Sequence, residues 1–328
     1  MTNSSGNAGE RNGPSSARSA FAPDDVVAAR YKIVRLIGSG GTGEVYEALD
    51  TALGVTVALK ALKPSVAGSA IQLERFRREI QSARKVTHFN VCRIFDIGIQ
   101  NGSGRDRFFL TMELLAGQSL ADRIEKGDRY TPEEALPIAT QIAEGLDAAH
   151  AVGIVHRDLK PGNIMLLPPP TGRFAQRAVI TDFGIALSEE QSDMRLTESD
   201  ELIGTPEYMA PEQAEPGPAT PATDVYALGL ILYEMLSKRR PFETAGTALA
   251  TVLVRRREPP RPLHEVLPGV PAAWEAAIHR CLEREPARRF SRAGQLIAAL
   301  HESPPAGPAG SDPQTGTGFF GRLTRKLR

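Results

Sequence analysis

Residues 156–163 read HRDLKPGN, and two further short stretches follow them along the chain: DFG at 182–184 and APE at 210–212. The occurrence of all three stretches in this order by chance is negligible. We therefore reject the alternative that they are unrelated loops with unremarkable polar residues. The three stretches therefore indicate one common site.

A glycine-rich stretch lies upstream, where residues 38–45 read GSGGTGEV between two strand-like runs. A dinucleotide-binding fingerprint would require a strand before the glycines and a helix after them, so this placement argues against a Rossmann site. Glycine has no Cβ, which allows backbone N–H groups to approach phosphate oxygens closely. The stretch is a candidate phosphate-binding hairpin, and an ordinary turn is the alternative.

Lys60 ends the stretch VALK, a strand whose other residues suit burial. A buried cation needs an anionic partner to offset its desolvation. Glu79, nineteen residues later, is the candidate partner. The alternative for an isolated lysine on a strand is a solvated edge position, because most lysines are exposed.

Together these stretches resemble the eukaryotic-type (Hanks-type) bacterial serine/threonine protein kinases, over about residues 31–300. The resemblance implies an α+β protein with the two-lobe kinase fold: a small N-lobe of antiparallel sheet with one helix, and a larger, mainly helical C-lobe. It also implies ATP and Mg²⁺ as cofactors, with Mn²⁺ as a possible substitute. The expected reaction transfers the γ-phosphoryl group of Mg-ATP to Ser or Thr hydroxyls of protein substrates.

The resemblance assigns a role to each matching residue of this chain. Asp158 would accept the proton of the substrate hydroxyl, Lys160 would steady the transferred phosphate, and Lys60 would hold the α- and β-phosphates and pair with Glu79. The metal ligands would be Asn163 and Asp182. Nucleotide-binding roles fall on Gly38, Ser39, Gly40, Gly41, Gly43, Val45, Ala58, Lys60, Met112 (the gatekeeper), Glu113 and Leu115 (whose carbonyl and amide would bond adenine) and Leu166.

Residues 182–212 correspond by resemblance to an activation segment. An arginine directly before Asp158 offers a bidentate partner for a phosphate on this segment. We therefore expect autophosphorylation at Thr197 or Ser199, and the alternative is that both are solvated hydroxyls. Thr205 is assigned to the substrate-binding loop.

Five other residues have structural roles by resemblance or by type. Asp224 would anchor the catalytic loop through backbone amides, and Arg289 would pair with Glu212. His156 is expected to pack beneath the loop. Cys92 and Cys281 have no zinc or disulfide spacing around them and are expected to be core residues in a reducing compartment.

The composition and patterning divide the chain into three parts. Residues 1–28 are expected to be a disordered leader, residues 29–301 the kinase domain (N-lobe about 29–114, C-lobe about 115–301), and residues 302–328 a flexible tail. Within the domain we expect strands at 31–38, 44–50, 55–62, 91–99 and 107–114 and helices at 70–85, 132–152, 224–237 and 271–282. Residues 166–177 should lengthen a hairpin with an exposed tip.

The charge balance and the absence of apolar runs exclude several classes of protein. Lys plus Arg and Asp plus Glu each number 39, which argues against a nucleic-acid binder. No signal peptide or stretch of about 18 apolar residues is present, so we expect a cytoplasmic protein. The basic amphipathic segment 319–328 suggests weak contact with a membrane surface, and a solvated or partner-binding tail is the alternative.

Two functional alternatives remain beside the kinase. A pseudokinase scaffold would bind nucleotide and partners without turnover, but it usually lacks the lysine or one of the two aspartates that are present here. A small-molecule kinase usually lacks the long activation segment and the APE motif. A transient homodimer is expected if the chain phosphorylates itself in trans.

Overall fold

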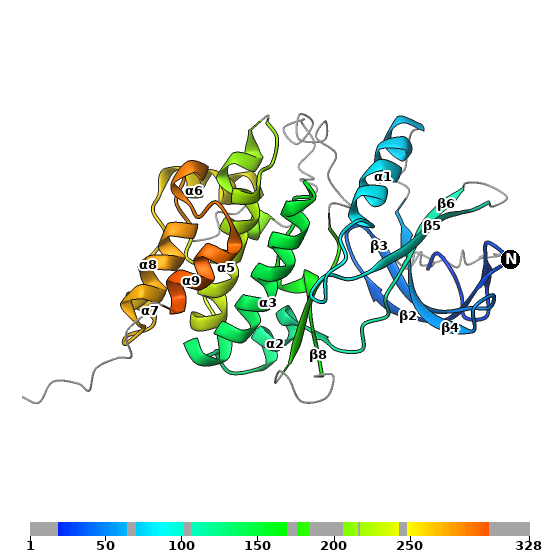
Figure 1. Cartoon of the computed structure of the whole chain (residues 1–328), viewed down its shortest axis with the longest axis horizontal. Helices are drawn as coiled ribbons and strands as arrows, with labels where there is room; N and C mark the ends of the chain where they lie inside the picture. The colour runs from blue at the N-terminus through cyan, green and yellow to red at the C-terminus, as the bar shows by residue number, and fades with distance from the viewer. Residues whose placement is uncertain are drawn as a thin grey trace, which may run out of the picture.

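Six strands form one antiparallel sheet in the order β1-β2-β3-β4-β6-β5 (Figure 1). The computed structural model describes residues 19–63, 70–101, 106–168, 176–183, 206–215, 217–242 and 248–301. The strands are β1 (Val26–Val27), β2 (Tyr31–Ser39), β3 (Gly43–Asp50), β4 (Val55–Leu62), β5 (Ile94–Gln100) and β6 (Arg107–Met112). The sheet and the helical part occupy opposite ends of the molecule in Figure 1, as the two-lobe prediction requires.

The sheet forms because its strands alternate apolar and polar residues, which places one set of side chains on one face. On β3, for example, Tyr46, Ala48 and Asp50 are buried and point to the same face. The register pairs Val45 with Lys60 and Ala58 with Met112. Residues expected to contact the nucleotide therefore lie next to one another on neighbouring strands.

Residues 19–28 pack against this sheet, so the prediction of a disordered leader is wrong for these ten residues. Phe21 is buried and its ring contacts the ring of Tyr46 edge-on, with 5.7 Å between centroids. The backbone N–H of Ala20 donates to Glu44 at 2.7 Å. The apolar residues Phe21 and Val27 join the core of the sheet, which offsets the entropy of ordering the segment. Residues 1–18 lie outside the described residues.

One helix, α1 (Ala70–Ala83), accompanies the sheet, as predicted for residues 70–85. Ile80 is fully buried and packs with Leu62 of β4 and Leu110 of β6. This small apolar cluster attaches the helix to the sheet, because burying aliphatic side chains stabilises the packed state by about 1.5–3 kcal/mol for each side chain.

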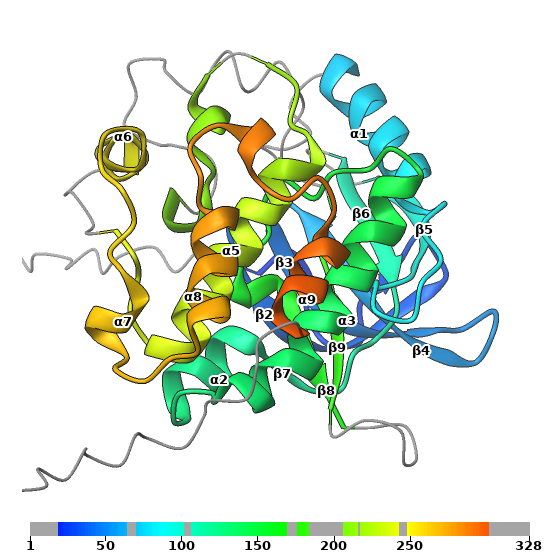
Figure 2. The same ribbon diagram turned by 60° about the vertical axis from the view of Figure 1, so that its left-hand side comes forward.

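The larger part of the molecule is helical. Within the described residues its α-helices are α2 (Leu120–Lys126), α3 (Pro132–Ala151), α5 (Pro221–Ser237), α6 (Ala248–Arg257), α7 (Leu263–Val266), α8 (Ala272–Cys281) and α9 (Ala293–His301). Helix α3 begins with a capping box, in which Thr131 and Glu134 each bond the other's backbone N–H. Helix α5 is apolar on all sides and is the buried centre, in contact with α3 and α8 (Figure 2).

A small second sheet of β7 (Gln118–Ser119), β8 (Ile164–Leu167) and β9 (Arg177–Ile180) lies between the two parts. Strands β8 and β9 pair with Leu167 opposite Arg177, so the two sides of the predicted hairpin are joined. Residues 169–175 at its tip are outside the described part. Backbone bonds join Asn90 and Cys92 to Ile180 and connect this sheet to the N-lobe.

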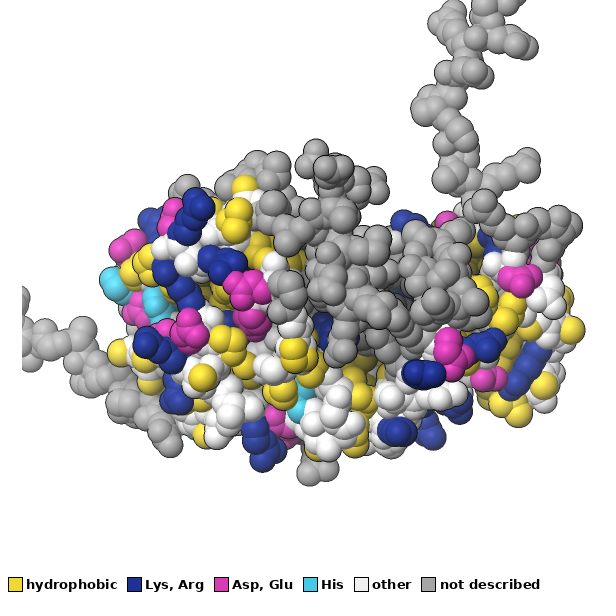
Figure 3. Space-filling model, turned by 90° about the horizontal axis from the view of Figure 1, so that it is seen from above, with side chains coloured by type: hydrophobic (Ala, Val, Ile, Leu, Met, Phe, Trp, Pro, Cys, Tyr) yellow, Lys and Arg dark blue, Asp and Glu magenta, His cyan; other side chains and the backbone are white. Residues whose placement is uncertain are grey.

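Two surface properties agree with the composition. In the described residues, no helix has both the length and the apolar character that crossing a membrane requires. On the face shown in Figure 3, Lys and Arg side chains lie among Asp and Glu side chains. The tail, residues 302–328, is outside the described residues.

Candidate active site

The loop that follows α3 is anchored by a buried carboxylate. Asp224 on α5 is 1% exposed and accepts the backbone N–H of His156 at 2.8 Å and of Arg157 at 2.9 Å. The ring nitrogen Nε2 of His150 lies 2.8 Å from the same carboxylate. The predicted anchoring role of Asp224 is therefore confirmed.

His156 lies beneath the loop, as predicted. Its side chain is fully buried, and its ring packs on Phe183 with 4.7 Å between centroids. The backbone N–H of Asp158 donates to Nδ1 at 3.3 Å, so the proton is on Nε2, which donates to the carbonyl of Thr181 at 2.8 Å. The imidazole thus connects the catalytic loop to the residue that precedes Asp182.

Three predicted site residues lie together on the loop and on η1 (Pro161–Asn163). The ammonium group of Lys160 is 2.8 Å from Oδ2 of Asp158. The amide nitrogen of Asn163 donates to the backbone carbonyl of Asp158 at 2.8 Å and to Oδ2 at 3.3 Å. Each side chain limits the orientation of the next, so the carboxylate of Asp158 is held by a cation and an amide.

Lys60 and Asp182 meet although they are 122 positions apart in the sequence. The ammonium group of Lys60 lies 2.7 Å from Oδ1 of Asp182. The lysine side chain is 3% exposed and the aspartate 28% exposed, so the buried cation has the anionic partner that its desolvation demands. The side chain of Glu79, the partner predicted for Lys60, is outside the described residues.

Two residues of the site have a left-handed backbone conformation, which residues other than glycine rarely adopt. The φ angle is 67° at Arg157 and 61° at Asp182. Such conformations persist only where surrounding contacts enforce them, and they concentrate at functional sites. Arg157 directly precedes Asp158, and Asp182 pairs with Lys60, so both left-handed residues lie at the predicted site.

The glycine hairpin joins β2 to β3. The backbone N–H of Gly40 donates to the carbonyl of Gly43 at 2.9 Å and closes the turn. A Cβ added at Gly38, Gly40 or Gly41 would meet no atom within 4 Å, whereas one at Gly43 would lie 2.1 Å from the carbonyl oxygen of Ala61. Gly43 is therefore required by close packing, and the other three leave the backbone open to a ligand.

The segment after β6 is fixed by its own contacts. The backbone N–H of Glu113 donates to the carbonyl of Arg93 at 2.9 Å, and its carboxylate lies 3.1 Å from the guanidinium of Arg177. Leu166, predicted to contact adenine, is buried on β8. Met112 and Asp182 lie in the lining of one small hollow, which also contains Ala83, Val91, Cys92, Ile94 and Phe183.

The residues present fit a magnesium–nucleotide. Asp182 offers a carboxylate, and the amide nitrogen of Asn163 is bonded to Asp158, so its amide oxygen is the atom available as a ligand. Mg²⁺ prefers such oxygen donors and is usually held by one or two of them together with phosphates. Lys60 supplies a cation beside them, and the glycine hairpin supplies backbone N–H groups.

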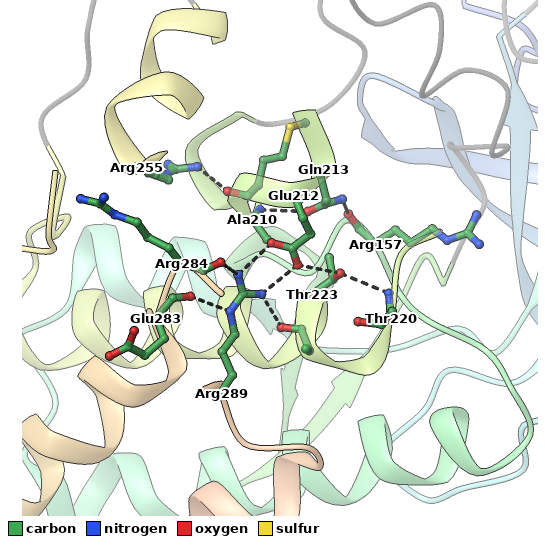
Figure 4. Close-up of polar contacts among 12 residues, drawn as sticks. Arg157, Ala210, Glu212, Gln213, Thr220, Thr223, Arg255, Glu283, Arg284 and Arg289 are labelled. Atoms are coloured by element: carbon green, nitrogen blue, oxygen red, sulfur yellow. Dashed lines mark hydrogen bonds and ion pairs between the residues drawn. The ribbon is translucent and has the colours of Figure 1, made fainter. Parts of the chain in front are cut away.

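Behind the loop, the carboxylate of Glu212 forms a buried ion pair with Arg289, as predicted (Figure 4). The guanidinium makes two bonds to this carboxylate, both of 2.8 Å, and also donates to the carbonyls of Glu283, Arg284 and Ala222. The pair attaches η3 (Pro211–Ala214) to the end of the C-lobe.

A second buried arginine, Arg255 on α6, was not predicted. It is 3% exposed, and it donates to the backbone carbonyls of Met209 and Glu207, each at 2.6 Å. Burial lowers the pKa of its guanidinium. Arg255 thus holds the segment that follows Thr205. No pattern in the sequence distinguishes it from the exposed arginines beside it, because only the packing of α6 against the segment reveals its contacts.

Several predicted site residues are outside the described residues. They are Thr197, Ser199 and Thr205. Their assigned roles remain predictions. The cysteines, in contrast, are both buried and unpaired, and burial raises the pKa of each thiol, as expected of core residues.

Comparisons with known proteins agree with this geometry. Residues 31–301 match the model of the protein kinase domain. The serine/threonine-protein kinase PknA of Mycobacterium tuberculosis is 38% identical over 276 residues, covering 84% of this chain and 61% of PknA. A probable serine/threonine-protein kinase PknB of Corynebacterium glutamicum is 34% identical over 279 residues, covering 84% of this chain and 42% of PknB. The chain therefore spans less than two thirds of the length of these curated relatives.

The crystal structure of the Mycobacterium tuberculosis PknI kinase domain superposes with a TM-score of 0.68 at 26% identity. The superposition covers 86% of this chain and 99% of that domain. The expected architecture of an antiparallel sheet followed by a mainly helical part is confirmed by this similarity.

Proposed function

The chain belongs to the protein kinase family, and from this premise we propose that it is a serine/threonine protein kinase. It transfers the γ-phosphoryl group of Mg-ATP to Ser or Thr hydroxyls of protein substrates. The observation that carries the proposal is that Asp158, Lys160 and Asn163 form one bonded group, while Lys60 and Asp182 form a second. All five side chains that a phosphoryl transfer requires are present with suitable partners.

In the proposed reaction, the substrate hydroxyl gives its proton to the carboxylate of Asp158 as its oxygen bonds to the γ-phosphorus. The bond between that phosphorus and the oxygen bridging to the β-phosphate breaks, and ADP leaves. Lys160, 2.8 Å from Asp158, is placed to neutralise charge on the transferred phosphoryl group. Lys60 orients the α- and β-phosphates. Mg²⁺ held by Asn163 and Asp182 would neutralise phosphate charge.

The choice of Ser or Thr as acceptor rests on Lys160 and on the relatives. A lysine two residues after the catalytic aspartate is the form that the resemblance associates with serine/threonine kinases. PknA and PknB carry that description in their names. A substrate whose only acceptor hydroxyl is on tyrosine is the negative control in a phosphorylation assay.

We further propose that the kinase phosphorylates its own activation segment at Thr197 or Ser199, through a transient homodimer if the reaction occurs in trans. Arg157, directly before Asp158, supplies a guanidinium that suits a phosphate.

A cytoplasmic site of action fits the two free thiols, since unpaired cysteines are usual in a reducing compartment. Weak contact of residues 319–328 with anionic lipid is a separate proposal, tested by liposome flotation with and without these residues.

The experiment is intact mass spectrometry of the purified chain after incubation with Mg-ATP. An Asp158→Asn variant and a metal-free sample run beside it. We expect adducts of phosphate mass on the natural chain that are absent from both controls, and fragmentation should place them at Thr197 or Ser199.

The contrary result is equally clear. If nucleotide binds, yet neither the chain nor a generic protein substrate gains phosphate, the proposed activity is wrong for the isolated chain, which is then a pseudokinase scaffold or a kinase that requires an activator. If phosphate is gained but neither Thr197 nor Ser199 carries it, the activity stands and the proposed phosphosites are wrong.

A further inference from the structure

The peptide unit that joins Arg157 to Asp158 is held at both of its polar ends. Its N–H, which belongs to Asp158, donates to Nδ1 of His156 at 3.3 Å. Its carbonyl, which belongs to Arg157, accepts a hydrogen bond from the side-chain amide of Gln213 at 2.8 Å (Figure 4). Because the peptide unit is planar, these two bonds fix the plane from which Asp158 begins.

The two bonds to this peptide unit matter because Arg157 has a φ angle of 67°. A left-handed backbone at an arginine is unfavourable by itself and needs external contacts to persist. Asp224 bonds the N–H of Arg157 at 2.9 Å, and Gln213 bonds its carbonyl at 2.8 Å. Both backbone groups of the strained residue are therefore held by side chains from the C-lobe.

Gln213 is itself firmly placed. Its side-chain oxygen accepts the N–H of Ala210 at 2.9 Å, and its own N–H donates to the carbonyl of Ala210 at 3.0 Å. The preceding residue, Glu212, is the one bound by Arg289. The amide nitrogen of Gln213 thus has a fixed position, set by η3 and by the buried ion pair.

We propose that Gln213 is a positioning residue for phosphoryl transfer, acting through the carbonyl of Arg157 on the orientation of Asp158. The inference rests on the proposed kinase function. It also connects two parts of the site, because η3 follows directly on the segment 206–209, whose carbonyls are held by Arg255. A shift of this segment would be transmitted to Asp158 by the Gln213 amide.

The test uses Gln213→Glu in the full chain. A glutamate of the same shape keeps an oxygen that can accept the N–H of Ala210, but it replaces the donor to Arg157 with a second acceptor. Gln213→Met removes both bonds at similar volume and without added charge. Gln295→Glu is the matched control, because Gln295 also bonds a nearby backbone N–H, that of Ser291 at 3.0 Å, and is exposed.

The measurements are kcat and KM on a generic protein substrate, the Kd for ADP by calorimetry, and the melting temperature. We expect both Gln213 variants to lower kcat by about 10- to 100-fold, since small misplacements of a reacting group have effects of this size. The KM for ATP and the Kd for ADP should remain within about twofold, because the side-chain amide of Gln213 bonds Ala210 and Arg157, and neither of these is assigned to nucleotide binding. Gln295→Glu should change none of these values.

Three results would overturn the proposal. The first is a folded Gln213→Glu variant with natural kcat. The second is a variant that melts at a lower temperature but keeps the natural kcat when the number of active sites is determined by ADP binding. That result would make the role of Gln213 purely structural. The third is failure of both variants to fold at any temperature. An inactive natural chain measured in parallel would instead refute the kinase function, and with it the basis of this inference.

Discussion

The catalytic loop and the glycine hairpin contact the same nucleotide in the proposed reaction, yet they are held in place by different means. The loop is held by buried side chains, above all Asp224, which bonds two of its N–H groups. The hairpin is held by backbone pairing of β2 and β3, and open space surrounds Gly38 and Gly40. Altering the loop side should therefore lower stability, whereas altering the unobstructed glycines of the hairpin should remove ligand contacts.

The largest loss of stability is expected from Arg289→Ala. Breaking a buried ion pair from one side leaves the other charge uncompensated and costs roughly 3–5 kcal/mol. Here the carbonyls of Glu283, Arg284 and Ala222 lose a donor as well. Urea denaturation should show a lower unfolding midpoint, while the Kd for ADP of the folded protein stays near its natural value.

Arg292→Ala is the matched control for that experiment. The side chain of Arg292 is 71% exposed and lies 3.3 Å from Asp147, and surface pairs contribute about 0–1 kcal/mol. If Arg289→Ala were no more destabilising than Arg292→Ala, the view that buried charges hold the loop side would be wrong.

Lys60→Met, on the sheet side, should lower activity much more than stability. Removing one preorganised cation from a phosphoryl-transfer site is expected to lower kcat by about 10²–10³-fold. The melting temperature should change less than in Arg289→Ala, because methionine keeps most of the buried volume of the lysine and no backbone carbonyl among the described residues loses a donor, whereas three do in Arg289→Ala. Lys32→Met, an exposed lysine on β2, serves as the control and should keep full activity. Unfolding of Lys60→Met under conditions where the natural chain is stable would contradict the comparison.

The hairpin contains its own matched pair, Gly40→Ala and Gly43→Ala. A Cβ at Gly43 would lie 2.1 Å from the carbonyl oxygen of Ala61, and overpacking of this kind costs about 1–3 kcal/mol. A Cβ at Gly40 meets nothing, so that variant should unfold at the natural temperature or slightly above it. Gly40→Ala should instead raise the KM for ATP severalfold. Equal melting temperatures for the two variants would refute this division.

The smallest effect is expected at Asp50, where pH is the variable. Hydrogen bonds from Arg30 hold the pKa of this buried carboxyl below its ordinary value. Its stabilising contribution is therefore fully present above the ordinary pKa of about 3.9, and it is lost as pH falls through the lower, folded-state value. The difference in urea midpoint between the natural chain and Asp50→Asn should shrink on going from pH 7 to pH 3.

Asp24→Asn provides the control for the pH series. Asp24 also pairs with a cation, Lys32 at 2.8 Å, but its side chain is 81% exposed. Its removal should have little effect on the urea midpoint at either pH. A difference for Asp50→Asn that stays constant between pH 7 and pH 3 would contradict the role assigned to the Arg30 bonds.

Elements with a regular pattern were predictable to within a few residues. The strand predicted at 55–62 is β4, and the helix predicted at 132–152 is α3, which ends at Ala151. The helices α6 and α9, of ten and nine residues, were not predicted individually. Shorter elements were also missed: β7 has two residues and α7 has four, too few for any periodicity to appear. Helix α5 begins three residues before its predicted start, because Pro221 takes its first position and the apolar pattern begins only after the first turn.

The site was predictable only where a motif carried it. Asp158, Asn163 and Asp182 were identified by resemblance; in the structure Asn163 bonds Asp158, and Asp182 pairs with Lys60. Gln213 and Arg255 were missed because their partners are backbone carbonyls, and a carbonyl has no signature in the sequence. Contacts of this kind depend on how η3 and α6 pack, which is decided by the tertiary structure.

The packing of residues 19–28 on the sheet has a practical consequence for expressing fragments. The family match begins at residue 31, but a protein cut there would lose Phe21 and β1. Part of β2 would become a bare sheet edge with unpaired backbone groups, and such edges promote association between molecules. A soluble catalytic fragment should therefore begin at or before Ser19, and one that begins at Tyr31 should aggregate.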